Sequence, residues 1–117
     1  MTLPQPMPFF SATAGFTAGS DTPRAFLERC LDRLAEFEPA VGAFVCHDIA
    51  AARVAADSAT ARWRDGRKLS PIDGIPLGIK DIIETADMPT GQGSPLFAGW
   101  RTGRDAASVA ALREAGR

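Results

Sequence analysis

The sequence lacks any long hydrophobic run and any strong charge imbalance. No apolar stretch approaches the roughly 20 residues that span a bilayer, so we expect no membrane segment. No basic residue precedes Arg24, which argues against a secretory signal and favours a cytoplasmic protein. A formal net charge of −1 provides no basic surface for nucleic acid or anionic lipid.

Histidine and cysteine are also scarce. His47 is the only histidine, and Cys30 and Cys46 are the only cysteines. A Ser-His-Asp triad would have to use His47, but nothing around it resembles a nucleophile elbow. A zinc site needs more ligands than one histidine and two dispersed cysteines provide. We therefore expect no metal or organic cofactor, and we expect both cysteines to be small buried side chains rather than a disulfide.

The composition is that of a globular protein, with 45% hydrophobic and 23% charged residues. We expect an irregular N-terminal arm over residues 1–20, followed by one α/β domain over residues 21–117. Because a glycine-ended helix in an α/β chain normally leads into a strand, we expect this domain to be truncated at its C-terminus.

Within this domain the apolar spacing predicts three helices and two strands. The helices are expected over residues 21–38, 48–65 and 105–115, and the strands over 41–46 and 75–80. Asp21 or Thr22, Asp48 and Asp105 are the expected N-caps of the helices, and Pro39 is expected to close the first one.

The segment from Ile75 to Lys80 has the most informative pattern. In a strand, alternate apolar residues would face the core, and Lys80 would lie on the other face beside Gly78. Because glycine has no side chain, space would remain open beside the lysine amine. A simpler interpretation is a lysine at a strand end that reaches solvent near Asp73 or Asp81. Spacing alone favours this simpler interpretation.

The residues around this lysine resemble a known family. Residues 74–81 read GIPLGIKD, preceded by SPID and followed by IIETADMPTGQGSP. This block is similar to the one around the catalytic lysine of the amidase signature family. The likeness covers about residues 20–117, in one order and without large gaps. Asp87 stands where the family often has glycine, and Ser70 replaces the more usual glycine before a proline.

The resemblance implies an α/β fold in which a mixed β-sheet is covered by helices, with this chain as its N-terminal portion. It also implies hydrolysis of a carboxamide C–N bond by a Ser-cisSer-Lys triad in which Lys80 is the base. Neither Ser94 nor Ser108 matches the family's serines, so both triad serines are absent and the chain alone is expected to be inactive. Asp81 is expected to point away from Lys80, because a carboxylate contact would favour the charged lysine.

The implied partners are a small-molecule amide substrate in the complete enzyme and either the missing C-terminal part or a second copy of the chain. Two other hypotheses remain open. One is a non-catalytic remnant or interaction module of the same ancestry, and the other is an ordinary small α/β domain. An amidase fragment would expose apolar surface along Phe26, Leu31 and Leu34, whereas both alternatives predict cooperative unfolding of the 117 residues.

Overall fold

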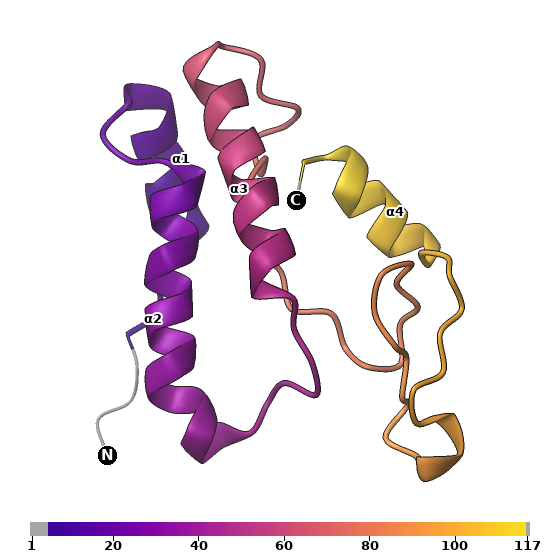
Figure 1. Cartoon of the computed structure of the whole chain (residues 1–117). Coiled ribbons are helices and arrows are strands. Elements are labelled where there is room, and N and C mark those ends of the chain that lie inside the picture. The colour runs from indigo at the N-terminus through magenta and orange to yellow at the C-terminus, as the bar shows by residue number, and fades with distance from the viewer. Residues whose placement is uncertain (1–4, 117) are drawn as a thin grey trace.

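The computed structural model describes residues 5–116 and consists of helices joined by long irregular segments (Figure 1). The elements are α1 (Phe9–Ala18), α2 (Pro23–Val41), α3 (Ile49–Arg64), the 3-10 turn η1 (Pro95–Phe97) and α4 (Ala107–Glu114). Helices α2 and α3 lie side by side, and α4 lies beyond α3 with the long loop that precedes it. The radius of gyration is 15.3 Å, whereas a compact domain of this length has about 13 Å. The chain is therefore flat and open.

The predicted mixed β-sheet is wrong, because residues 5–116 contain no β-strand. Val41 is the last residue of α2, and residues 43–48 and 75–80 run as irregular backbone. Alternating apolar residues indicate which side of a segment is buried, but a strand also needs a neighbouring backbone to complete its hydrogen bonds. No other described segment pairs with residues 75–80 in this way.

The N-terminal region also differs from its prediction as an irregular arm. Residues 1–4 lie outside the described residues, but Phe9–Ala18 forms α1. Its buried positions, Ala12 and Phe16, are one helical turn apart and join a core with Phe26 and Ile75. Phe16 packs edge-on against Phe26, with ring centroids 6.2 Å apart. Only these two residues of α1 are buried, which is too weak a periodic signal to identify the helix from its sequence.

Helix α2 begins as the sequence predicts and ends later. The Thr22 hydroxyl accepts a hydrogen bond from the Ala25 amide at 3.1 Å, and Pro23 occupies the first turn. Pro39 lies inside the helix rather than closing it, and the helix continues to a left-handed Gly42. Phe26 is buried instead of exposed.

Helix α3 confirms its predicted cap and its close packing. The Asp48 carboxylate accepts a hydrogen bond from the Ala51 amide at 3.0 Å. Ala56 and Ala59 are buried on the face that approaches α2. Short alanine side chains allow the two helices to lie close together. Long charged side chains at the border of this contact can then reach from one helix to the other and form ion pairs.

Those ion pairs form a cluster on the surface that joins α2 to α3. Arg24 contacts Asp57 at 2.6 Å and Glu28 at 2.9 Å, and Arg53 contacts Glu28 at 2.7 Å. The two arginines lower the pKa of Glu28 to about 2, with hydrogen bonding to Arg53 as the larger cause.

Helix α4 starts at Ala107, and Asp105 does not cap it. The Asp105 carboxylate instead accepts hydrogen bonds from the Ala86 amide at 2.7 Å and from Arg113 Nε at 2.8 Å. Asp105 therefore ties the loop after the lysine segment to α4, a long-range contact that local sequence does not show. None of the helices described between residues 5 and 116 is long and apolar enough to cross a bilayer.

Candidate active site

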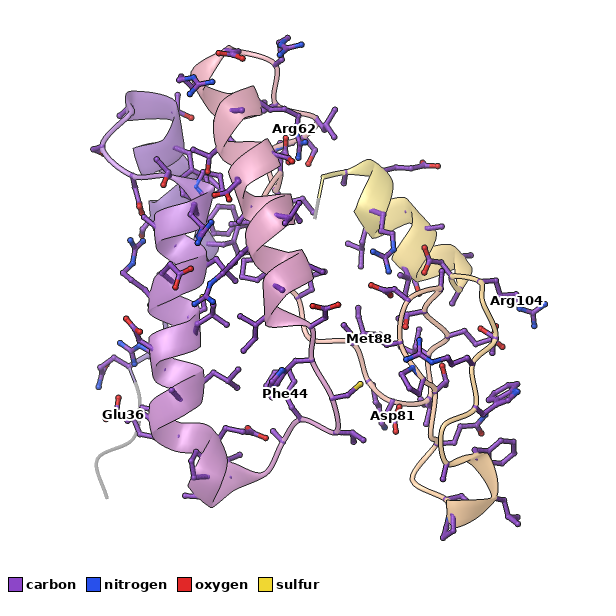
Figure 2. The ribbon with its side chains drawn as sticks, in the orientation of Figure 1. Glu36, Phe44, Arg62, Asp81, Met88 and Arg104 are labelled. Carbon is purple, nitrogen blue, oxygen red and sulfur yellow. The ribbon has the colours of Figure 1, made fainter. Side chains whose placement is uncertain are left out.

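A hollow of about 610 Å³ lies between α3, α4 and the irregular segments around residues 43–48 and 74–89. Figure 2 shows Phe44 and Met88 on these segments, below the ends of α3 and α4. Apolar side chains including Phe44, Leu77 and Met88 make up much of its lining, together with Lys80. The hollow is large enough for a small organic ligand, and its walls come from regions far apart in the sequence.

Lys80 lies in the lining of this hollow and is exposed. Its carbonyl oxygen accepts a hydrogen bond from the Ile83 amide at 2.9 Å, which turns the chain directly after the lysine. No ion pair within residues 5–116 involves its amine. Lys80 is therefore a lining residue of the hollow without an ion-pair partner among the described residues.

Gly78 leaves space beside the lysine segment. A Cβ placed on Gly78 would meet its nearest neighbour, the Phe44 ring, at 3.8 Å, which is ordinary contact. The structure thus agrees with the expected open space. Close packing does not require glycine at position 78, because a small side chain would fit there.

Asp81 serves a structural role, as expected. Its Oδ1 accepts a hydrogen bond from the Gly91 amide at 2.9 Å, and its carbonyl oxygen accepts one from the Gln92 amide at 2.8 Å. A Cβ on Gly91 would lie 2.8 Å from Asp81 Oδ2. Asp81 and Gly91 therefore fix the end of the lysine segment against the loop before η1.

The serines within this chain do not gather around Lys80. The Ser94 hydroxyl accepts a hydrogen bond from the Leu96 amide at 3.3 Å and starts η1. Ser108 is exposed in the first turn of α4, and neither serine lines the hollow. Both therefore have the local roles that the sequence indicates.

The cysteines and the histidine do not form a reactive site. Cys30 is half-buried, and burial raises the pKa of its thiol. Cys46 is exposed rather than buried, and its Sγ lies 3.9 Å from Met88 Sδ at the hollow. Both cysteines are free, and His47 lines the same wall. Within the described part of the chain no three His, Cys, Asp or Glu side chains are grouped to hold a metal ion.

Sequence reasoning missed two ion-pair groups, one of which contributes to the lining of the hollow. Arg113 contacts Asp87 at 2.7 Å and Asp105 at 2.8 Å, which joins the loop at Asp87 to α4. The Ala86 amide and Arg113 together hold the pKa of Asp105 below its usual range. Asp87 stands where the resembled motif often has glycine, and this departure is the sequence signal from which the contact could have been found.

The second missed group joins α3 to the loop before the lysine segment. Arg62 makes two hydrogen bonds to the fully buried carboxylate of Asp73, from Nε at 2.8 Å and from Nη2 at 2.6 Å. Hydrogen bonding to Asp73 raises the pKa of Arg62. Asp73 lies in a turn beyond the end of α3, so the two partners share no regular element and the sequence gives no sign of the pair.

Sequence comparison connects this site to known proteins. The profile of the family described as Amidase matches residues 25–117. A glutamyl-tRNA(Gln) amidotransferase subunit of Chloroflexus aggregans is 42% identical over 106 residues, which cover 91% of this chain and 22% of that protein. The same subunit of Acidothermus cellulolyticus is 43% identical over 86 residues, or 74% of this chain and 17% of that protein. The chain thus spans about a fifth of the length of these curated relatives.

Solved structures agree with the sequence relatives. The peptide amidase PAM, solved in complex with the competitive inhibitor chymostatin, is 34% identical with a TM-score of 0.82, covering 90% of this chain and 22% of that one. A chain from a vestigial protein complex, related to the evolutionary origins of an s-triazine catabolic enzyme, is 26% identical with a TM-score of 0.86. It covers 94% of this chain and 24% of that one. The matched residues include the lysine segment and most of the chain, and this chain belongs to the amidase family.

Proposed function

We propose that this chain supplies the base, Lys80, of an enzyme that hydrolyses the C–N bond of a small carboxamide. The observation that carries the proposal is a lysine without an ion-pair partner in the described residues, placed in a largely apolar hollow. A lysine that serves as a general base must reach the group whose proton it takes, and a place in the lining of a hollow that can hold a small ligand would allow this. Family membership supplies the reaction class.

The proposed mechanism is a Ser-cisSer-Lys triad. Neutral Lys80 takes a proton from a bridging serine, which in turn takes the proton of the serine that attacks the amide carbonyl. Neither Ser94 nor Ser108 lines the hollow, so we place both triad serines outside these 117 residues, in a polypeptide that covers the hollow. Residues 21–117 would then be the N-terminal part of one larger amidase domain in the cytoplasm.

A non-catalytic interaction module is the second candidate. The observation that favours it is the set of apolar side chains left exposed beside the hollow: Phe44, Val45, Leu77 and Ile82. Such a surface suits contact with another polypeptide whether or not chemistry takes place there. The two candidates differ in whether the native protein hydrolyses amides.

The first experiment is the intact mass of the native protein, together with ammonia release from simple aliphatic and aromatic amides. We expect a mass above 12.4 kDa, or a tightly bound second polypeptide, and a Gly/Ser-rich segment in the added sequence. We also expect amide hydrolysis by the native assembly and none by the 117 residues alone. Hydrolysis by a protein of 12.4 kDa would contradict the placement of the serines, and an inactive native protein would favour the interaction module.

A further inference from the structure

The carboxylate of Asp73 is completely buried, and both its oxygens are used. Oδ1 accepts from Arg62 Nη2, and Oδ2 accepts from Arg62 Nε and from the Leu69 amide at 2.9 Å. The Asp73 carboxylate loses its hydration entirely while the Arg62 side chain stays 26% exposed, and such a pair gives little net stability compared with apolar residues of similar size. Stability alone therefore does not account for this pair, and its position in the fold suggests another role.

Three segments meet at Asp73. Trp63 Nε1, in the last turn of α3, donates to the Asp73 carbonyl oxygen at 2.8 Å. The Gly74 amide donates to the Gly116 carbonyl oxygen at 2.8 Å, just past the end of α4. A Cβ on Gly116 would overlap the Asp73 carboxylate, so the backbone approaches it closely. We call this meeting point the Asp73 junction, made of Arg62, Trp63, Asp73, Gly74 and Gly116.

Lys80 is separated from this junction by a short unsupported segment. Among the described residues, no backbone group of residues 76–79 has a hydrogen-bond partner. The segment is held at its far end by Asp81, whose contacts with Gly91 and Gln92 fix the turn after the lysine. Figure 2 shows Arg62 at the upper end of α3 and Asp81 in the loop region well below it. The path of the segment is therefore set by its two fixed ends.

The junction is one of the two ends that set the path of the lysine segment. Beyond the Ile75 amide, which donates to the Ile72 carbonyl oxygen at 3.0 Å, no backbone hydrogen bond restrains the chain before Lys80, so a shift of residues 72–75 changes the path of the lysine segment. A displacement of about 1 Å at a reacting group can cost roughly a hundredfold in rate. The Arg62 guanidinium binds the carboxylate at two points, which fixes orientation as well as distance.

We infer that Asp73, held by Arg62, is a positioning residue for Lys80: the buried pair sets where the lysine segment starts and so where the amine lies in the hollow. The inference rests on the proposed function, because it assigns to the pair the placement of a catalytic lysine. A pair with only a structural role would change the stability of the fold and leave the rate of each folded molecule unchanged.

The test measures kcat and KM of the native enzyme and of its Asp73→Asn and Arg62→Lys variants. Circular dichroism gives the folded fraction of each, and rates are expressed per folded molecule. We expect kcat to fall about tenfold to a hundredfold in both variants, with KM changed by less than about threefold. Glu28→Gln is the matched control. It also removes a carboxylate charge from a cluster at α3, but the cluster joins α3 to α2 and does not contact the lysine segment. Its kcat should stay within about twofold of the native value.

The same substitutions in a Lys80→Ala background show whether the pair acts through the lysine. If it does, Asp73→Asn adds no further loss to Lys80→Ala. An unchanged kcat in both folded variants, or the same fold-loss with and without Lys80, overturns the inference. If Asp73→Asn does not fold, Arg62→Lys decides alone, because it keeps the charge and removes only the two-point contact.

The failure of the proposed function has a different signature. Full activity of Lys80→Ala would overturn the proposed function, and with it the positioning role. An inactive Lys80→Ala combined with unchanged kcat in the two pair variants would overturn only the positioning role.

Discussion

The carboxylate of Asp81 is bound to the Gly91 amide at 2.9 Å and not to the amine of Lys80 beside it in the sequence. This contact closes the turn after the lysine, and Lys80 lines the hollow without an ion-pair partner in the described residues. Sequence neighbours of opposite charge thus have separate roles, one in holding the loop and one, in the proposed function, in the chemistry.

The first prediction concerns the close approach at Gly91. Gly91→Ala should lower the free energy of unfolding by about 1–3 kcal/mol, because its Cβ would lie 2.8 Å from Asp81 Oδ2 and the loop must shift. Gly78→Ala is the matched control, with its nearest neighbour at 3.8 Å, and it should change stability by about 0.5 kcal/mol or less. Urea unfolding of the two variants checks the difference, and equal losses would show that the loop is not tightly held.

The second prediction concerns Gly74, where α2, α3 and the lysine segment meet. Its φ is +86°, and a Cβ would lie 2.6 Å from Pro23 Cβ and 2.8 Å from Ala59 Cβ. Gly74→Ala should therefore combine about 1–2 kcal/mol of backbone strain with a packing clash of about 1–3 kcal/mol.

Gly99→Ala separates these two costs. Gly99 has a similar φ of +73° but no atom within 4 Å of its would-be Cβ, so only the backbone cost applies. Unfolding free energies should differ by about 1–3 kcal/mol between the two variants. A loss at Gly99 as large as that at Gly74 would argue against the close packing of α2 and α3 around the junction.

The third prediction is a pH dependence of stability from the ion-pair cluster. The pKa of Glu28 falls from 4.5 to about 2 in the folded protein, so its contribution to stability is complete above pH 4.5 and is lost as the pH falls toward 2. Unfolding free energies of the native sequence and Glu28→Gln, measured from about pH 6 to about pH 2, should converge toward the acid end. A constant difference across that range would show that Glu28 does not titrate with its arginine partners.

The local helix signals could be predicted from the sequence because they depend on near neighbours. Thr22 and Asp48 cap helices as expected, since each bonds an amide three residues away. Asp105 is also an aspartate that precedes a helix, as Asp48 is. Its carboxylate nevertheless accepts hydrogen bonds from the Ala86 amide and from Arg113. A tertiary contact replaced the local one, and no sequence pattern distinguishes the two cases.

The strand predictions failed because a strand depends on a partner that is distant in the sequence. Residues 75–80 have the alternation of a strand, but alternation does not provide the second backbone that a ladder needs. The lysine within this segment was found through the family resemblance of its motif rather than through spacing. The Arg62–Asp73 pair was found only in the structure, since Asp73 lies in a turn outside the helix that carries Arg62.

The central claim is that Lys80 is the base of an amide-hydrolysing site, and its most direct test compares the chain's two lysines. Lys68 lies over the Trp63 ring at 4.7 Å and is absent from the lining of the hollow, so Lys68→Ala controls for the loss of a lysine. In the native enzyme Lys80→Ala should lower kcat by about a hundredfold to ten-thousandfold while Lys68→Ala leaves it within about twofold. Equal kcat values for the two variants would contradict the account.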